Sequence, residues 1–238
     1  LESLRDKYQT PFFFFTDECL ALSPTKRLCQ GMIERNLNVQ WTAEMRFEKN
    51  LGRELLELMR DAGCRKIVFG LETFNQRMMD FMKKGIKQEH VRRISEDCVD
   101  LGIAVHCYII VGFPTEKEEE ALETMNFIVQ NEKLHRSPGF SCQPCLFDLE
   151  KEAPIMNDPG SYGIRRIMRP SSEDLSLGYF YEVQEGMTPE QAERLYQHVY
   201  GKISEVVCEL PYNYSMADGL LYIVREREKA LAAQTVAS

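Results

Sequence analysis

The sequence lacks the features that membrane, secreted and nucleic-acid-binding proteins need. Its 238 residues include no apolar stretch near the ~20 residues that cross a bilayer. Residues 1–5 do not begin a secretory signal, in which a charged start precedes an apolar run. The 29 lysines and arginines form no basic run and are outnumbered by 37 acidic residues, so the net charge is -8. We expect a cytoplasmic protein that binds neither membrane nor nucleic acid.

Strong metal and phosphate motifs are also missing. Four histidines are too few and too scattered for a histidine-rich ligand set, and no glycine-rich phosphate loop occurs. Of eight cysteines, only Cys142 and Cys145 form a C-x-x-C pair. Without two further ligands or a thioredoxin-like context, this pair predicts neither a zinc site nor redox chemistry. We expect reduced thiols that are mostly buried, and no metal ligands in this chain.

The sequence does contain a regular alternation of apolar and amphipathic segments. Five apolar runs, too short for helices, lie at residues 12–15, 39–45, 66–71, 103–111 and 140–149. Segments of helical periodicity separate them, and this order is typical of βα units around a parallel sheet. The run 12–15 is continuously apolar, as expected of a strand covered on both faces. The pattern predicts an α/β fold, with residues 1–150 as its main unit.

The pattern changes from about residue 151. Prolines, glycines, Asn and Asp mark an irregular connection before a short extended run at 162–168. Thr188, Pro189 and Gln191 then combine an N-cap, a first-turn proline and a capping glutamine. The helix that they begin has an apolar face formed by Ala192, Leu195, Val199, Ile203 and Val206. We expect this face to pack on the rest of the protein, and a last helix at 216–231, so that residues 151–238 form a C-terminal helical extension.

Polar residues close four of the predicted strands. In parallel α/β proteins, ligand-binding groups gather where strands end and loops begin. The candidate residues at these strand ends are Asp17, Glu18, Arg46, Glu72 and Gly112. Carboxylates accept from hydroxyl or ammonium groups, and a cation pairs with a carboxylate, so this rim suits a ligand that has all three groups. Helix capping and solvated loops are the alternative interpretation of the acidic residues.

The same stretches resemble a known superfamily when they are taken together. The series is FFFFTDE, then WTAEMR, then AGCRKIVFGLETFNQRMMDFMKKG, then LGIAVHCYIIVGFPTEKEEE. In order and spacing it resembles radical S-adenosylmethionine enzymes, in the branch often preceded by a cobalamin-binding domain. The resemblance covers roughly residues 10–130, and it extends more loosely to 147–151 and the stretch YFYEVQEGMT. It implies an incomplete, TIM-like parallel (β/α) barrel.

The resemblance implies roles for the acidic residues at the strand ends. Residues 12–17 match the strand whose end approaches the methionyl amino group, so Asp17 or Glu18 would accept hydrogen bonds from that ammonium. Glu72 matches the strand end that contacts the ribose hydroxyls. Each role uses a carboxylate as a hydrogen-bond acceptor.

It also implies partners for the other groups of the ligand. Lys84, in the MKKG segment, matches the basic position that pairs with the methionyl carboxylate, with Arg46 and Lys83 as competing candidates. Ile110 and Gly112 match the strand that packs against adenine, where an apolar side chain lies on the ring and glycine admits close backbone approach. Lys84 is expected to close a short helix that Thr73 caps.

Structural alternatives exist for several of these residues. Lys83 and Lys84 fit a pair of cations at a helix C-terminus, where the macrodipole favours them. Ile110 fits a core position. Residues 116–120 fit a solvated first turn of a helix rather than a metal site.

The chain departs from the family in one large respect, because it has no C-x-x-x-C-x-x-C. That motif supplies three thiolates to a 4Fe-4S cluster and leaves one iron open for S-adenosylmethionine. Since the chain starts at Leu1 and its first strand matches a later strand of the family, we expect the cluster loop, and a cobalamin-binding segment if present, to lie upstream. We expect this segment alone to be inactive.

For the whole protein the resemblance implies 5'-deoxyadenosyl-radical chemistry on a small-molecule substrate. Methyl transfer or oxidative cyclisation are the expected reactions, and cobalamin is an optional further cofactor. Two other classes stay open. The first is a parallel-barrel lyase or isomerase without a cluster, and the second is a non-catalytic interaction domain, which would need an exposed apolar stripe on residues 188–208.

Overall fold

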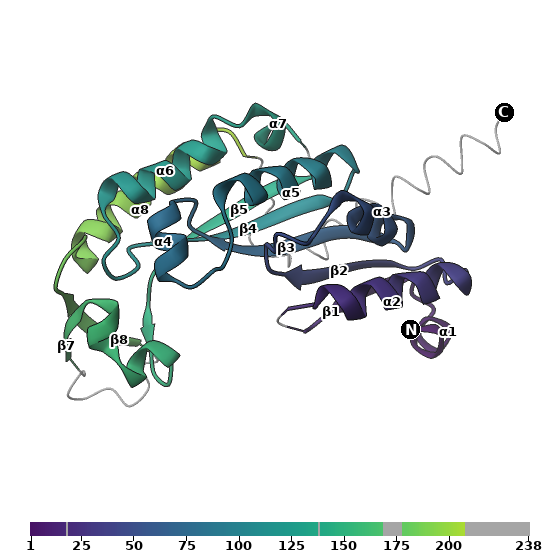
Figure 1. The fold of residues 1–238 in the computed structure, drawn as a ribbon, viewed down its shortest axis with the longest axis horizontal. Coiled ribbons are helices and arrows are strands. Elements are labelled where there is room, and N and C mark those ends of the chain that lie inside the picture. The colour runs from purple at the N-terminus through teal and green to yellow at the C-terminus, as the bar shows by residue number, and fades with distance from the viewer. Residues whose placement is uncertain (18, 138, 169–177, 208–238) are drawn as a thin grey trace.

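A computed structural model describes residues 1–17, 19–137, 139–168 and 178–207 (Figure 1). The strands are β1 (Phe12–Phe15), β2 (Gln40–Met45), β3 (Cys64–Glu72), β4 (Ala104–Val111), β5 (Phe140–Leu146), β6 (Leu149–Glu150), β7 (Ile164–Met168) and β8 (Gly178–Val183). The helices are α1 (Glu2–Tyr8), α2 (Leu22–Glu34), α3 (Arg53–Asp61), α4 (Gln76–Phe81), α5 (Gln88–Asp100), α6 (Glu118–Val129), α7 (Glu132–His135) and α8 (Pro189–Ser204), with 3-10 turns at Pro154–Asn157 and Pro159–Tyr162. Within these ranges, no helix combines the length and apolar character that crossing a membrane requires.

The main sheet is parallel and open. Its strands follow the order β1-β2-β3-β4-β5, and every neighbouring pair is parallel. Each strand therefore ends at the same edge, here called the carboxyl edge, which lies beside α4 and the β7–β8 pair (Figure 1). Among the described strands, β1 and β5 do not pair with each other, so the sheet does not close. The predicted α/β fold with an incomplete parallel barrel is confirmed.

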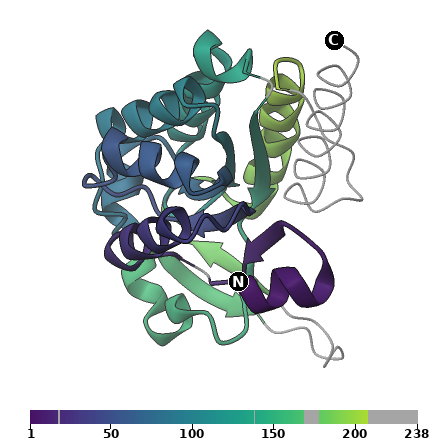
Figure 2. The same ribbon diagram turned by 90° about the vertical axis from the view of Figure 1, so that its right-hand side faces the viewer.

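The main core lies on one face of the sheet. Helices α2, α3, α5 and α6 cover this face (Figures 1 and 2). Strand side chains alternate between faces, and every second one packs into the helix-side core: Trp41, Ala43, Ile67, Phe69, Val105, Cys107, Ile109 and Phe140. The opposite face, here called the inner face, carries Thr42, Lys66, His106, Tyr108 and Ser141. The apolar residues Val68, Ala104 and Ile110 lie on this face as well, so its lining is mixed, whereas the helix-side face is apolar.

The first strand differs from its prediction. Phe14 is 45% exposed, and within the described residues β1 pairs only with β2. One side of β1 is tied to the core, since the Phe15 ring meets Trp41 edge-on at 5.4 Å between centroids. The prediction that residues 12–15 are covered on both faces is therefore wrong for Phe14.

The C-terminal part contains a second, small sheet. Strands β6, β8 and β7 form it in that order, with antiparallel pairing. It surrounds a separate apolar cluster of Leu149, Ile155, Ile164 and Tyr181. The expected extended run at 162–168 corresponds to β7, whereas the pairing with β8 was not predicted from the sequence.

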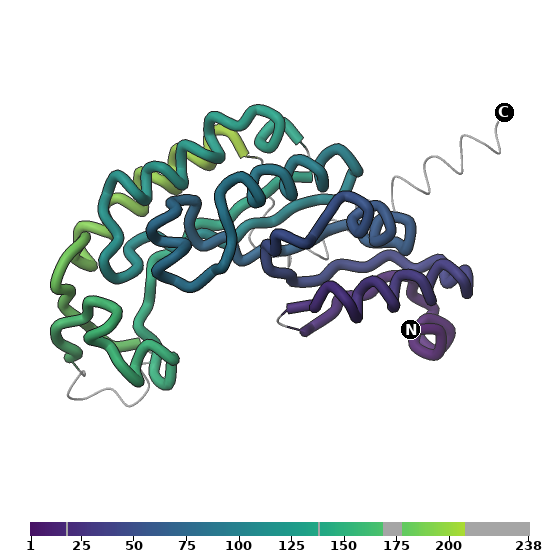
Figure 3. The backbone as a smooth tube through the Cα atoms, in the orientation of Figure 1, coloured from purple at the N-terminus to yellow at the C-terminus, as the bar shows by residue number. Residues whose placement is uncertain are grey.

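The chain then returns to the main sheet as α8. This helix contacts α6, β4 and β5, and it runs beside α6 in Figure 3. Ala192, Leu195, Val199 and Ile203 are buried in the main core, so the predicted packing of this face is confirmed. The interaction-domain alternative loses the exposed stripe that it needs. The helix expected at 216–231 lies outside the described residues.

Candidate functional site

Strand β3 ends in an irregular turn that redirects its last side chain. The register between β3 and β4 shifts between Gly70 and Glu72. Glu72 has a φ of 62°, a left-handed conformation that costs a non-glycine residue about 1 kcal/mol. Bulges of this kind re-aim side chains and are frequent beside active sites. The turn makes Glu72 available at the carboxyl edge.

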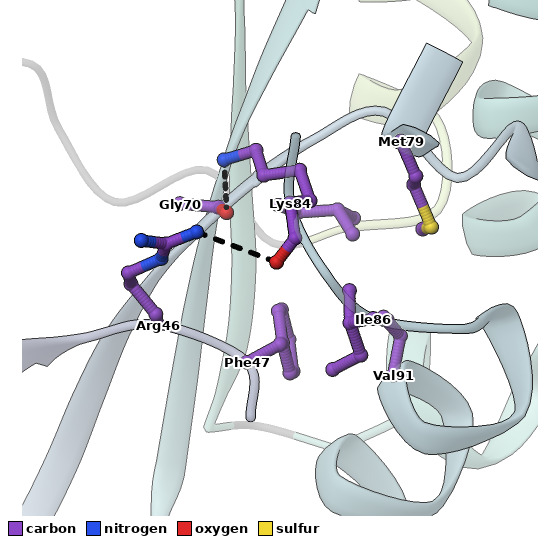
Figure 4. Close-up of a pocket in the computed structure, with 8 residues that line it drawn as sticks. Arg46, Phe47, Gly70, Met79, Lys84, Ile86 and Val91 are labelled. Atoms are coloured by element: carbon purple, nitrogen blue, oxygen red, sulfur yellow. Dashed lines mark hydrogen bonds between the residues drawn. The ribbon is translucent and has the colours of Figure 1, made fainter. Parts of the chain in front are cut away.

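Lys84 folds back onto this strand end. Its Nζ donates to the Gly70 carbonyl at 3.0 Å (Figure 4). The same atom donates to Glu72 Oε1 at 3.3 Å. An added Cβ at position 70 would lie 2.7 Å from Glu72 Oε1, so a larger residue there would displace the Glu72 carboxylate. Arg46, at the end of β2, donates from Nη2 to the Lys84 carbonyl at 3.3 Å. The predicted residues Arg46, Glu72 and Lys84 therefore come together at one place.

Several interactions hold the loop that carries Lys84. Lys83 and Gly85, on either side of it, both have positive φ angles, 55° and 68°. Gln76 donates to the Ile86 carbonyl at 3.2 Å and accepts from the Gln88 backbone N–H at 3.3 Å. These contacts hold Lys84 over the strand end.

The helix before this loop does not begin at the predicted cap. Asn75 caps α4, because its side-chain oxygen accepts from Met78 N at 3.0 Å. The Thr73 hydroxyl instead pairs with Thr124 on α6 at 3.2 Å. The predicted Thr73 cap is wrong, because Thr73 is buried against α6. The position of Lys84 beyond the helix is unaffected.

The charges of Lys84 and Glu72 favour a ligand that carries both a carboxylate and hydrogen-bond donors. Burial lowers the pKa of Lys84, while the Glu72 carboxylate acts in the opposite direction. An ammonium has three N–H donors, and the described contacts of Lys84 use two of them. Lys83 is exposed, and its side chain has no hydrogen bond or ion pair among the described residues. Lys84 is thus more than a helix-terminal charge, and it keeps one donor for a carboxylate.

The neighbouring strand β4 brings Ile110 and Gly112 to the same edge. Ile109 and Val111 belong to the helix-side core, whereas Ile110 is half-buried on the inner face. Ile110 is therefore not a core residue, and its side chain is open to a ligand. Gly112 has a φ of 85°, and a Cβ there would lie 2.4 Å from the Ala192 Cβ of α8. The packing of α8 therefore requires glycine at this position.

A buried carboxyl group holds the loop after β4. Gly112 N donates to Glu116 Oε2 at 2.7 Å, and Met187 N donates to the Glu116 carbonyl at 2.8 Å. Glu116 is fully buried, and its Oε1 has no hydrogen-bond partner among the described residues. Burial raises the pKa of Glu116 from 4.5 to about 8, so the group holds a proton at neutral pH. No sequence pattern indicated this role of Glu116.

A second acidic residue of this segment is also buried. Glu120 pairs with Arg77 of α4, which also donates to the Thr115 carbonyl at 2.8 Å. Glu120 Oε2 accepts from Lys117 N at 2.9 Å at the start of α6. The prediction of a solvated turn at 116–120 is wrong at both ends, because these carboxyl groups hold the loop through contacts from other elements.

The remaining predicted site residues lie apart. Asp17 is exposed beyond the end of β1 and makes no hydrogen bond or ion pair within the described ranges. Strand β1 lies two strands from β3, a separation of about 10 Å. Asp17 therefore shares the carboxyl edge with Glu72 and Lys84 without contacting them. Glu18 lies outside the described residues.

The described cysteines do not fit an iron-sulfur cluster. In the described part of the chain, no three or more His, Cys, Asp or Glu side chains gather as a metal site. Burial raises the pKa of Cys142 to about 12, and Cys145 donates its S–H to the Ile109 carbonyl at 3.1 Å. A cluster needs accessible thiolates in suitable spacing. The side chains present do not provide them.

We predict that the 238-residue chain binds no stable 4Fe-4S cluster. Anaerobic reconstitution with iron and sulfide, followed by iron analysis and visible spectroscopy, tests this. The expected product has no broad thiolate-to-iron absorption. About four irons per chain would contradict the prediction and identify Cys142 and Cys145 as ligands.

An open parallel βα sheet with a cation–carboxylate pair at its carboxyl edge defines a class of α/β protein that binds small polar ligands at its strand ends. Residues 1–128 match the family model for the radical SAM superfamily. The chain belongs to this superfamily, and the match indicates an enzyme.

Curated relatives match part of the chain. An uncharacterized methyltransferase of Pyrococcus horikoshii is 28% identical over 94 residues, which are 40% of this chain and 20% of the relative. The bacteriochlorophyllide d C-12(1)-methyltransferase of Chlorobaculum tepidum is 28% identical over 122 residues, which are 50% of this chain and 26% of the relative. The chain thus spans about a fifth to a quarter of these proteins.

A solved structure shares the fold. It is the radical S-adenosylmethionine methyltransferase TsrM from Kitasatospora setae, described with cobalamin and a [4Fe-4S] cluster bound. The superposition has a TM-score of 0.62 and 15% sequence identity, and it covers 97% of this chain and 55% of TsrM. At this identity the likeness shows the fold.

Proposed function

We propose that the chain binds S-adenosylmethionine at the carboxyl edge of β3 and β4, as part of an enzyme that generates a 5'-deoxyadenosyl radical or transfers a methyl group. One observation carries the proposal: Lys84 Nζ lies 3.3 Å from Glu72 Oε1 and 3.0 Å from the Gly70 carbonyl. The pair offers a cation and a carboxylate side by side, and the family match to residues 1–128 supports the ligand.

Four described residues have one function each in this proposal. Lys84 pairs with the methionyl carboxylate through its third N–H. Glu72 accepts hydrogen bonds from the ribose hydroxyls through Oε2, since Oε1 is bound to Lys84. Ile110 packs against the adenine ring. Asp17 accepts from the methionyl ammonium, and the same role is proposed for Glu18.

The other cofactors are proposed for the protein as a whole. A bound 4Fe-4S cluster would supply the electron for reductive cleavage, and we propose that its ligands lie outside these 238 residues, which contain no C-x-x-x-C-x-x-C. Cobalamin enters through the likeness to TsrM, and we assign no described residue to it. We propose methyl transfer as the reaction, because both relatives are named methyltransferases. We propose a small molecule as the substrate and the cytoplasm as the location. Oxidative cyclisation is the second proposed reaction.

Two substitutions test the site. Lys84→Ala and Glu72→Gln should each weaken S-adenosylmethionine binding about tenfold to a hundredfold, because a charge-assisted contact contributes about 1.5 to 3 kcal/mol. Isothermal titration with the full-length, reconstituted protein measures the affinity, and circular dichroism confirms that the variants fold.

Lys83→Ala is the matched control. It removes the same charge from the adjacent, exposed position and should leave the affinity within about twofold, a change of roughly 0.4 kcal/mol. Wild-type affinity in both site variants would exclude Lys84 and Glu72 from the site. An equal loss in the Lys83 variant would attribute the effect to net charge.

A further inference from the structure

The inner face of the sheet contains a polar floor far below the carboxyl edge. Thr42 pairs in register with Lys66, and His106 pairs with Ser141 on the neighbouring strand. Thr42 and His106 are 0% and 1% exposed. Two atoms on this floor, Thr42 Oγ1 and His106 Nε2, are buried and have no hydrogen-bond partner among the described residues. A buried polar atom without a partner costs about 1 to 3 kcal/mol, so each requires an explanation.

The other nitrogen of His106 is already held. Nδ1 lies 3.0 Å from the Ser141 hydroxyl, which fixes the ring orientation. The Tyr108 ring stands edge-on to the imidazole at 4.9 Å between centroids. Burial and then the nearby Lys66 ammonium lower the pKa of His106 to about 3, so the ring is neutral. A neutral, oriented imidazole with one unused nitrogen is suited to ligand recognition.

Tyr108 lies between this floor and the carboxyl edge and is far more exposed than the floor. His106 is 1% exposed, and Tyr108, two residues further along β4, is 38% exposed. Ile110 follows at the proposed S-adenosylmethionine site. Four residues of strand separate His106 from Ile110, a distance of about 13 Å. A small molecule about 13 Å long that lies along Tyr108 would span from the floor to the carboxyl edge.

We propose that Thr42, Lys66 and His106 form a subsite for an oxygen anion, a carboxylate or phosphate, at the end of the substrate opposite the reacting carbon. The inference rests on the proposed function, whose substrate it defines. Thr42 and Lys66 supply a hydroxyl and an ammonium donor, and His106 supplies Nε2–H when the Ser141 hydroxyl donates to Nδ1. The positive charge that acts on His106 comes from Lys66 and favours an anion. The edge of the subsite is the Tyr108 ring, which fits an apolar or aromatic substrate body.

The test uses histidine nitrogen signals as direct reporters. The full-length protein, labelled with 15N-histidine, is titrated with 3-phenylpropionate, 3-phenylpropyl phosphate and the neutral 3-phenylpropionamide. We expect at least one of the two anions to shift the His106 Nε2 signal saturably, and the anion that does so identifies the natural group. The amide should bind about tenfold more weakly or not at all.

Thr42→Val removes the hydroxyl at nearly constant shape and should weaken anion binding about tenfold. Its S-adenosylmethionine affinity should stay at the wild-type value, whereas Lys84→Ala should show the reverse pattern, so that the two proposals fail separately. If Thr42→Val unfolds, Ser141→Ala provides the second variant, because loss of the Nδ1 partner should change the His106 tautomer signal and weaken the anion. No saturable shift with either anion, equal binding of the amide, or undiminished binding by a folded variant would overturn the subsite.

Discussion

Replacing Val199 by Asp should destabilise the described fold by about 3 to 5 kcal/mol. Val199 is 1% exposed in the core that α8 shares with the main sheet. The substitution loses the about 1.5 to 3 kcal/mol of stabilisation that comes from burying the valine side chain. It also buries a carboxyl group in an apolar core, which costs further free energy. Urea denaturation, followed by far-ultraviolet circular dichroism, measures the free energy of unfolding.

Gln197→Asp is the control for this prediction. It introduces the same carboxyl group two residues earlier on α8, at an exposed position, and should change stability by less than about 0.5 kcal/mol. A Val199→Asp variant that unfolds at the wild-type urea concentration would show that the apolar face of α8 is solvated in solution.

Glu116→Gln should remove a pH dependence of stability that the wild-type protein has. Burial raises the pKa of Glu116 from 4.5 to about 8. Between these values the folded state holds a proton that the unfolded state releases, so the free energy of unfolding falls as pH rises, by at most about 1.4 kcal/mol per pH unit. Below pH 4.5 and above pH 8, this contribution is constant.

Comparing wild type with Glu116→Gln at pH 5, 6.5 and 8 isolates this one group, since all other titrations are common to both. The glutamine oxygen can still accept from Gly112 N, as Glu116 Oε2 does. We expect the variant to gain a few kcal/mol relative to wild type between pH 5 and pH 8. Parallel curves for the two proteins would mean that Glu116 is ionised in the folded state.

The positions of Glu72 and Gly112 at strand ends follow from the amino-acid sequence. Glu72 and Gly112 follow apolar runs of strand length, and a parallel sheet brings all strand ends to one edge. Lys84 was identified through its MKKG segment, and it lies against Glu72. The role of each residue towards S-adenosylmethionine stays a prediction.

The sequence could not predict the buried carboxyl groups that fix the loop after β4. Glu116 and Glu120 lie in a run of charge that resembles any solvated helix start, yet their burial depends on Met187 and Arg77 from other elements. For the same reason, α4 is capped by Asn75 and not by Thr73 as predicted, since Thr124 of α6 binds the Thr73 hydroxyl. Local preference is weak wherever a tertiary contact competes for the same side chain.

The sequence alone determined the order of βα units and the apolar face of α8. The reason is that the spacing of apolar residues along the chain sets which face of each helix or strand is buried. Only the tertiary structure decided which residues meet on the inner face. Thr42, Lys66 and His106 are far apart in sequence, and strand register aligns Thr42 with Lys66 and Val68 with His106. Register depends on pairing between strands, so the polar floor exists only once β2, β3 and β4 have assembled.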